Sequence, residues 1–321
     1  MTRELKHRNF GLGNRNMALA GKNALREGGY SFKTIETNAG HFRQFILYVK
    51  TTHQEVKDLK HIGRHHVLEY ARHLKEQTIT GKLAVSSAQN RLSAINTTLS
   101  LSRQDKACHV NPVAEGGLVK RTFIATVSKV ISAEAHIAAK GQVGERLSVM
   151  MDLQRAFGLR FKESALLNAK QALKQATQSQ KIRITDGTKG GRPRQVPVLH
   201  RTQLGILQQA AVLQGNHTSL IPQSQSLKIF ADYAYQALQK TGLNGYHGER
   251  HTYANARYEA LTGQKSPVEA QTGHGKNHIA YLSAQLNISM AEASRLDREA
   301  RLTISHELGH ARVAITNNYL G

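Results

Sequence analysis

Two stretches near the end of the chain gather side chains that exchange protons or bind anions. One runs from His247 to His251 (HGERH) and the other from Leu308 to Tyr319 (LGHARVAITNNY). Side chains three and four positions apart share one face of a helix. We therefore expect His247, Arg250 and His251 to point the same way, as a cationic cluster able to exchange protons near neutral pH. Tyr319 stands in an unusual place for a core aromatic.

The charge of the whole chain indicates a polyanionic partner. It has 44 Lys and Arg against 22 Asp and Glu, a net charge of +22 and a pI near 10.2. Nucleic acid is the first candidate, because phosphate neutralisation provides most non-specific affinity. An anionic membrane surface is the alternative, but the basic residues are spread along the chain and not gathered in one amphipathic helix. The single cysteine, Cys108, excludes a disulfide framework and a cysteine-based zinc site, so a reducing, cytoplasmic setting is expected.

Two further candidates lie just after Gly158, which separates two helical patterns. Arg160 and Glu163 are three residues apart, so the carboxylate can hold the guanidinium in place. The ordinary alternative is an exposed ion pair, which contributes well under about 1 kcal/mol to stability.

A glycine-rich reversal brings more basic groups together. Two alternating runs, 181–185 and 194–199, predict strands joined as a β-hairpin. Lys189, Arg192 and Arg194 lie in or beside its turn. A lysine in a turn is usually exposed without a function, but several basic groups on a β-finger could enter a DNA groove or meet a phosphate. The segment lacks the Gly-Lys-Ser/Thr order of a P-loop.

Helical regions must position these groups, which predicts a mainly α protein with a small β-hairpin (α+β). Periodic apolar residues predict helices from about 31 to 50, and over 64–77, 84–101, 119–131, 145–157, 202–214, 225–241 and 249–261. Residues 31–131 are expected to form a helical bundle. The basic, glycine-containing residues 1–30 are expected to be a loosely ordered arm or to lie along DNA phosphates, and 132–144 to be a linker before a second domain, 145–321. In the bundle Arg72, Lys82 and Arg91 either form a solvated face or contact DNA.

The ordered set of motifs resembles the catalytic domain of the tyrosine recombinases, the phage-integrase and Xer-like family. The set comprises Gly158-Leu159-Arg160, the segment around Lys189, the HxxRH of residues 247–251, Leu308-Gly309-His310 and Tyr319. Each motif alone is weak, and their order in so basic a chain makes the set specific. The bundle resembles the family's SAM-like core-binding domain, so the resemblance covers most of the chain. Within the family, the chain resembles the integrases of mobile genetic elements.

The resemblance implies a site-specific recombinase that cleaves and rejoins DNA through a 3′-phosphotyrosine intermediate. Tyr319 would be the nucleophile. Arg160 and Arg250 would bind the phosphoryl oxygens, for which a guanidinium fork suits the geometry. No metal and no cofactor is implied, because the bond is exchanged and not hydrolysed.

The remaining groups would handle protons and hold the site. His247 would accept the tyrosine proton or hold the phosphate, and Lys189 would protonate the departing 5′ oxygen. His310 would donate a hydrogen bond to the phosphate, with His251 and Glu163 in support. The implied partners are a specific double-stranded DNA site, three further copies of the chain in a homotetramer, and accessory DNA-bending proteins, in a cytoplasmic, nucleoid-associated setting.

The sequence departs from the family pattern in three places. His251 and His310 are 59 residues apart, more than the family usually has, so residues 276–301 read as an insertion. Glu249 stands where an apolar residue is commoner. Only two residues follow Tyr319, which leaves the mode of assembly open.

Three alternatives remain at this stage. His306 to His310 reads HELGH, the HExxH signature of zinc metalloproteases, although no third ligand follows it. A second alternative is a DNA-binding protein that has kept the fold without catalysis. A third is a type IB topoisomerase or hairpin telomere resolvase, which share the chemistry. The target site, and the choice among integration, excision and resolution, are not encoded in any motif.

Overall fold

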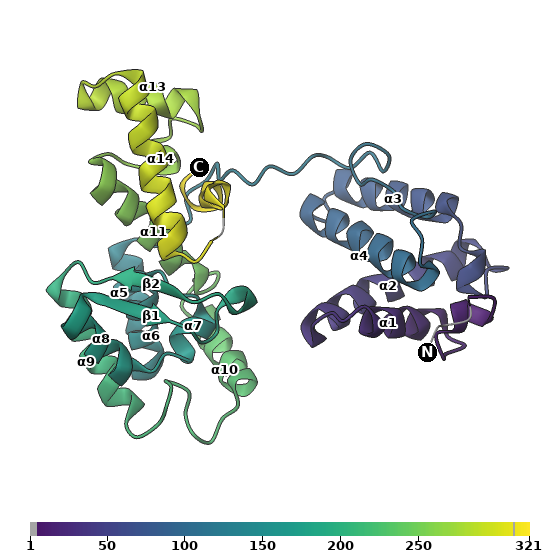
Figure 1. Ribbon diagram of the computed structural model, residues 1–321, viewed down its shortest axis with the longest axis horizontal. Helices are drawn as coiled ribbons and strands as arrows, with labels where there is room; N and C mark the ends of the chain where they lie inside the picture. The colour runs from purple at the N-terminus through teal and green to yellow at the C-terminus, as the bar shows by residue number, and fades with distance from the viewer. Residues whose placement is uncertain (1–4, 311) are drawn as a thin grey trace. The chain divides into compact units, whose positions relative to one another are not determined.

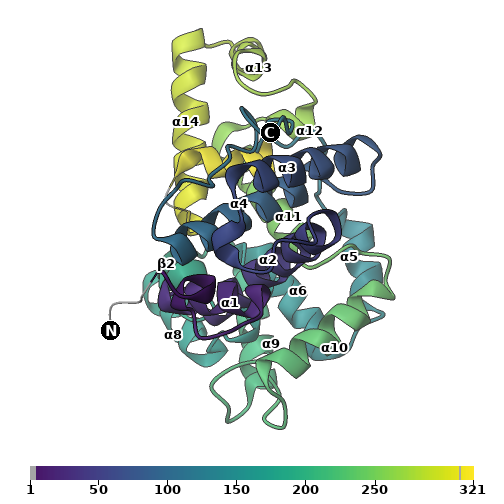
Figure 2. The same ribbon diagram turned by 90° about the vertical axis from the view of Figure 1, so that its right-hand side faces the viewer.

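The computed structural model describes residues 5–310 and 312–321 and divides the chain into two compact units, with the boundary between Thr122 and Phe123. Both units are helical, and the described residues form one two-stranded antiparallel sheet in the second unit (Figures 1 and 2). The predicted fold class is therefore confirmed. None of the helices built from the described residues has the length and apolarity needed to span a bilayer.

Unit 1 packs four helices around a core of aliphatic and aromatic side chains. Its α-helices are α1 (Met17–Glu27), α2 (Phe32–Thr52), α3 (Arg64–Ile79) and α4 (Val85–Arg103), with 3-10 turns at Arg8–Gly11 and Leu59–His61. Helix α2 begins at a capping side chain, since the Ser31 hydroxyl accepts from the Thr34 amide. Helices α2, α3 and α4 lie where the apolar spacing predicts them.

The expectation of a loosely ordered arm was wrong where the structure describes these residues, from residue 5 onward; residues 1–4 lie outside the described part. Helix α1 buries Met17, Ala20 and Ala24 in the core of unit 1. Glycine in this stretch indicates close packing and not disorder. A Cβ on Gly21 would lie 2.3 Å from a Phe42 ring carbon, so the missing side chain lets α1 and α2 approach each other.

The predicted boundary was also wrong. Residues 119–131 form no helix but an extended segment, which suits their many β-branched side chains. Extension lets the Ala125 amide donate to the Asn317 carbonyl (2.8 Å) and the Ile131 amide to Thr252 Oγ1 (3.0 Å). The expected linker 132–144 contains α5 (Ala133–Lys140), which packs against α6 within unit 2.

Unit 2 is built around α6, which packs against α9 and α11. Its larger elements are α6 (Glu145–Phe157), α8 (Ala169–Ser179), β1 (Lys181–Ile184), β2 (Arg194–Pro197), α9 (Arg201–Gln214), α10 (Leu227–Gln239), α11 (His247–Thr262), α13 (Lys276–Leu286) and α14 (Met290–Glu307). The shorter ones are α7 (Phe161–Ala165), α12 (Pro267–Ala270), α15 (Asn317–Leu320) and 3-10 turns at Lys189–Gly191 and Val313–Thr316.

Two features of unit 2 bear on the site. Strands β1 and β2 pair in antiparallel register, Ile184 opposite Arg194, and the predicted hairpin is confirmed. The insertion, residues 276–301, forms α13 and most of α14. Figures 1 and 2 show α13 beside one end of α14, whose other end leads to the segment bearing Tyr319.

Candidate active site

The ring of Tyr319 is the point on which the C-terminal motif residues converge. It belongs to α15, is 5% exposed, and its hydroxyl accepts a hydrogen bond from Arg250 Nε at 3.2 Å. Ring centroids of His251, His247 and His310 lie 4.7, 5.6 and 5.7 Å from its own. The two stretches with which the sequence analysis begins therefore form one site.

Arg250, which contacts the Tyr319 hydroxyl, is fully buried. Its Nη1 donates to the Gly158 carbonyl, and its Nη2 donates to the Leu308 carbonyl and lies 3.3 Å from His310 Nε2. One guanidinium thus joins three segments that are far apart in the sequence. Burial lowers the pKa of Arg250 to about 10, which still leaves it charged at neutral pH.

Gly158 is required by this arrangement. Its φ is +61°, a left-handed conformation that ends α6, and a Cβ there would lie 2.6 Å from the Tyr253 ring and 2.8 Å from Leu308. Because Gly158 has no side chain, its carbonyl can come close enough to accept the hydrogen bond from Arg250 Nη1.

Glu163 organises the arginines of the site. Its carboxylate, with no exposed surface, accepts from Arg160 Nη1 (2.6 Å) and from the Arg160 amide (2.8 Å). It also accepts a bidentate pair from Arg194 (2.8 and 2.7 Å) and lies 3.7 Å from Arg250 Nη1. Burial alone would raise the pKa of Glu163, but the hydrogen bonds and charge of Arg194, and then of Arg160, lower it to about 2. The surface ion pair weighed as the alternative is in fact a buried cluster.

The position of Arg194 corrects the expectation that it contacts DNA. Arg194 is 7% exposed, its side chain is paired with Glu163, and its Nε donates to the Glu307 carbonyl at 2.7 Å. The alternation of β2 turns Arg194 and Val196 inward and leaves Gln195 exposed. The Arg194 guanidinium is bonded to Glu163 on one side and to the Glu307 carbonyl on the other. It therefore holds Glu163 and the C-terminal end of α14 in place.

The three histidines of the site are held neutral. Burial, followed by the charges of nearby cations, lowers the pKa of His247 and of His251 to about 4 and that of His310 to about 3. Arginine has only donors, so the contact from Arg250 makes His310 Nε2 an acceptor and places the proton of the neutral ring on Nδ1. His247 keeps some exposed surface although its ring packs near His251 and Tyr319, and as a neutral imidazole it has a nitrogen free to accept a proton.

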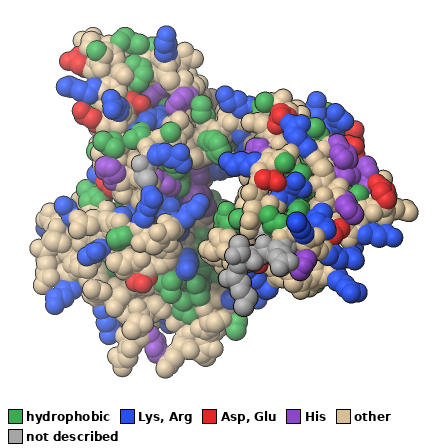
Figure 3. Space-filling model, turned by 45° about the vertical axis from the view of Figure 1, so that its right-hand side comes forward, with side chains coloured by type: hydrophobic (Ala, Val, Ile, Leu, Met, Phe, Trp, Pro, Cys, Tyr) green, Lys and Arg blue, Asp and Glu red, His purple; other side chains and the backbone are tan. Residues whose placement is uncertain are grey.

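The other expected basic residues lie apart from this centre. Lys189 and Arg192 are exposed in the hairpin turn, and the charge of Lys189 contributes to the low pKa of His310. In unit 1, Arg72 and Lys82 are exposed, whereas Arg91 is half-buried beside the Tyr70 hydroxyl. Figure 3 shows Lys and Arg side chains scattered over the visible faces of both units, with fewer Asp and Glu.

Two residues of the site escaped the sequence analysis. Lys129, on the extended segment 123–131, is close enough to lower the pKa of both His247 and His251, and nothing in its local sequence marks it. Asn255 donates from Nδ2 to the Tyr319 carbonyl at 3.2 Å. Its position four residues after His251 was a usable signal, because that spacing keeps it on the same helix face.

Glu249, the departure from the family pattern, is explained by a buried ion network behind α11. Its carboxylate contacts His136 Nδ1 at 2.6 Å and accepts from Arg155 at 2.9 Å. His136 Nε2 contacts Asp152 at 2.9 Å, and Lys140 donates to Asp152 at 2.6 Å. Burial alone would lower the pKa of His136, but the two carboxylates raise it. A charge can be buried here because every partner is present.

The HELGH segment does not have the geometry of a zinc site. Helix α14 ends at Glu307 and Gly309 has a φ of +70°, so His310 is not one helical turn beyond the exposed His306. Glu307 is occupied by Arg257 (2.9 Å) and the Tyr253 hydroxyl (2.8 Å). Among the described residues, the group spaced to hold a metal ion is His53, Glu55 and His66 of unit 1.

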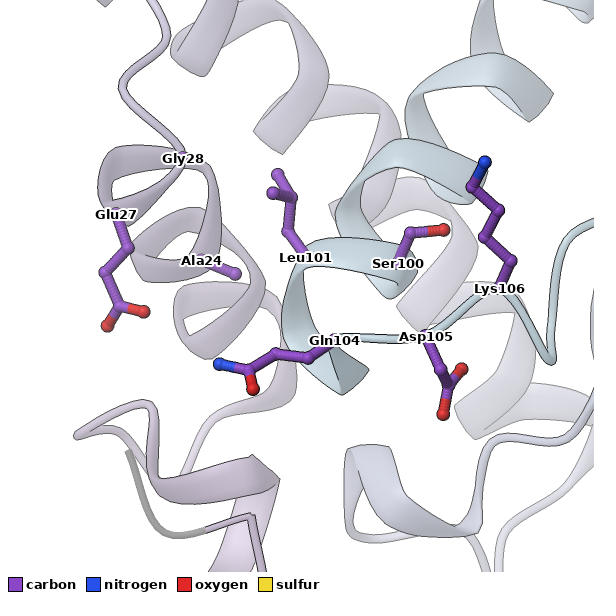
Figure 4. A pocket seen from close by; sticks show the side chains of 8 residues that line it. All are labelled: Ala24, Glu27, Gly28, Ser100, Leu101, Gln104, Asp105 and Lys106. Atoms are coloured by element: carbon purple, nitrogen blue, oxygen red, sulfur yellow. The ribbon is translucent and has the colours of Figure 1, made fainter. Parts of the chain in front are cut away.

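A pocket in unit 1 is a separate feature. It measures about 440 Å³ and is lined by the end of α1, the end of α4 and the loop after it (Figure 4). Its side chains are those of Ala24, Glu27, Ser100, Leu101, Gln104, Asp105 and Lys106. None of the expected site residues lines it.

The chain resembles known proteins in part of its sequence and in its fold. Residues 120–256 match the family model described as integrase. A XerH site-specific recombinase bound to a palindromic difH substrate matches with a TM-score of 0.54 and 13% identity, over 95% of this chain and 81% of the other. The Tn1549 transposon integrase in complex with transposon right end DNA matches with a TM-score of 0.55 and 12% identity, over 95% of both chains.

A lambda integrase dimer bound to a COC′ core site matches with a TM-score of 0.53 and 15% identity, over 87% of this chain and 75% of the other. No curated protein matches in sequence. At such identities the solved structures show a shared fold. The chain therefore has the fold of these recombinases and integrases, and its residues 120–256 match the integrase family model.

Proposed function

We propose that the chain is a catalytically active site-specific DNA recombinase, with Tyr319 as its nucleophile. The observation that carries the proposal is the hydrogen bond between the Tyr319 hydroxyl and Arg250 Nε, 3.2 Å long, among neutral imidazoles. A protein that only bound DNA would not need a buried guanidinium aimed at a tyrosine oxygen. The hydrogen bond from Arg250 orients the Tyr319 hydroxyl oxygen, which is the atom that would attack phosphorus.

The reaction exchanges one phosphodiester for another. Tyr319 Oη forms a bond to phosphorus, and the bond from phosphorus to the 5′ oxygen breaks, leaving a 3′-phosphotyrosine. His247 takes the phenolic proton, and Lys189 gives a proton to the departing 5′ oxygen. Attack by that 5′ hydroxyl, or by one from a second duplex, reverses the step and releases Tyr319.

Arg160 and Arg250 stabilise the charge that develops on the non-bridging oxygens. Arg250 is covered by the Tyr319 ring in the DNA-free chain, with its centroid 5.7 Å from Cζ. The phosphate therefore reaches Arg250 when the Tyr319 side chain turns aside while the backbone of α15 stays in place. His310 donates from Nδ1, the nitrogen that carries its proton.

We propose double-stranded DNA as the partner, recognised at a specific site and bound by a homotetramer with accessory DNA-bending proteins. The net charge of +22 supports this partner. The solved relatives support it as well, since their structures contain DNA substrates, and one is a lambda integrase tetramer bound to a Holliday junction. In unit 1 the exposed Arg72 and Lys82 are the candidate phosphate contacts.

The test uses nicked duplexes in which the cleaved fragment diffuses away, so that religation is prevented and the adduct accumulates. A library with randomised sequence around the nick is incubated with the full chain, and covalently bound DNA is recovered from denaturing gels. Tyr319→Phe is expected to abolish the adduct. Tyr281→Phe is the matched control, because Tyr281 belongs to α13 and its hydroxyl bonds to Gln264 at 3.1 Å. Persistence of the adduct in Tyr319→Phe would refute the assignment.

A further inference from the structure

A buried polar chain connects the insertion to α11. The Tyr258 hydroxyl of α11 donates to Asp297 of α14 at 2.6 Å and contacts His278 Nε2 of α13 at 2.9 Å. His278 Nδ1 contacts the Thr272 hydroxyl at 2.9 Å. Since the single Tyr258 proton goes to the carboxylate, His278 donates from Nε2 and accepts from Thr272. The insertion is thus fixed to the same helix that carries Arg250.

Arg301 extends this chain to the segment that bears Tyr319. Its side chain is buried, and Nε donates to both oxygens of Asp297 at 2.9 Å. Nη1 donates to Asn317 Oδ1 and Nη2 to the Gly321 carbonyl, both at 3.0 Å. The two acceptors lie on either side of Tyr319 in the sequence, so one guanidinium holds α15 at both ends.

Two further hydrogen bonds to the backbone of α15 come from single donors on neighbouring segments. The Ala125 amide donates to the Asn317 carbonyl, and Asn255 donates to the Tyr319 carbonyl. Arg301 differs because one side chain donates to this segment at two points, and its orientation is fixed by Asp297, which is bonded in turn to Tyr258. A lysine could not reproduce the fork, since it has one nitrogen where Arg301 uses three.

We propose that residues 276–301 position the nucleophile, and that Arg301 is the positioning residue. Through Arg301 these residues hold α15 in place, so that Tyr319 lies beside Arg250 before DNA binds. The catalytic part of this inference rests on the proposed function. Its structural part, the docking of residues 313–321 by Arg301, does not.

The first experiment measures docking without DNA. Hydrogen exchange of the full chain, followed by mass spectrometry, reports the backbone amides of residues 313–321. Arg301→Ala removes two charge-assisted hydrogen bonds to this segment and is expected to speed its exchange by at least about tenfold. Arg295→Ala, which removes an exposed arginine of the same helix, is the matched control and should leave the exchange unchanged.

Because Arg301 is buried, a second variant tests the proposal in case Arg301→Ala does not fold. Asn317→Ala removes one acceptor of the fork and leaves the Arg301–Asp297 pair intact. It is expected to speed exchange of the same peptide by a smaller factor of about threefold. Unchanged exchange of residues 313–321 in this variant and in a folded Arg301→Ala would overturn the proposal.

The second experiment measures the rate of adduct formation at saturating nicked duplex. A positioning role predicts that Asn317→Ala and Arg301→Ala slow this rate by about tenfold or more while the dissociation constant for DNA stays within about twofold. Equal losses in affinity and rate would contradict positioning. Faster exchange, with no adduct from the unsubstituted chain, would refute the proposed function and still support the docking by Arg301.

Discussion

Replacing Glu163 by glutamine tests whether a single buried carboxylate organises the arginines of the site. The amide keeps the shape of the side chain but removes the negative charge that Arg160 and Arg194 share and that lies 3.7 Å from Arg250. The fall of the Glu163 pKa from 4.5 to about 2 corresponds to a stabilisation of about 3 kcal/mol at neutral pH.

The sign of the pH dependence follows from the depressed pKa. The unfolded chain binds the proton more tightly, so this stabilisation is complete well above pH 4.5 and is lost as pH falls toward about 2. The difference in unfolding free energy between the unsubstituted chain and Glu163→Gln should thus be about 3 kcal/mol at pH 7 and roughly half of that at pH 3.

The assay is urea denaturation of the full chain at a series of pH values, followed by circular dichroism. Glu299→Gln, an exposed carboxylate on α14, is the matched control and should change the free energy by less than about 0.5 kcal/mol. A difference for Glu163→Gln that is below about 1 kcal/mol at pH 7, or that does not shrink on acidification, would refute the reasoning.

The remaining predictions concern the roles of single cations. Arg250→Ala should abolish adduct formation while DNA affinity, measured by filter binding, survives; an equal loss of both would mean that this arginine only holds DNA. Arg194→Gln should slow cleavage by about a hundredfold at unchanged affinity, whereas Arg192→Gln in the exposed turn should weaken binding more than cleavage. His136→Gln should lower the unfolding free energy more at pH 6 than at pH 9. The pKa of His136 is raised in the folded chain, so its stabilisation is complete below the pKa of the unfolded chain and is lost as pH rises through the pKa of the folded chain. A loss of stability that does not depend on pH would contradict the pairing of His136 with Glu249.

The sequence predicts the groups that meet at Tyr319 because motif order and helical spacing are local properties. His247, Arg250 and His251 share a face of α11 as three- and four-residue spacing requires. The hairpin follows from alternation, and helices α2, α3 and α4 follow from apolar periodicity. The family resemblance predicts that Arg160 and His310 join these groups. No spacing in the sequence predicts it, because both residues are far from α11 along the chain.

The features that the sequence could not predict depend on which side chains and backbone segments are buried in the fold. Arg194 reads as an exposed cation in a basic turn, and only the fold reveals that Glu163 needs it as a partner. Helix α1 was missed because Gly21 suggests disorder unless the Phe42 ring packed on it is known. The extended segment 123–131 has helical apolar spacing, but its amides are satisfied by Asn317 and Thr252, residues more than a hundred positions away.

The central claim is that Tyr319 becomes covalently attached to DNA. Its most direct test is protease digestion of the adduct formed on nicked duplex, followed by mass spectrometry of the peptide that carries a nucleotide. The peptide containing residues 313–321 should carry the added mass on Tyr319, joined through a 3′ phosphate. Attachment at any other residue, or no adduct from the unsubstituted chain on any duplex of the randomised library, would contradict it.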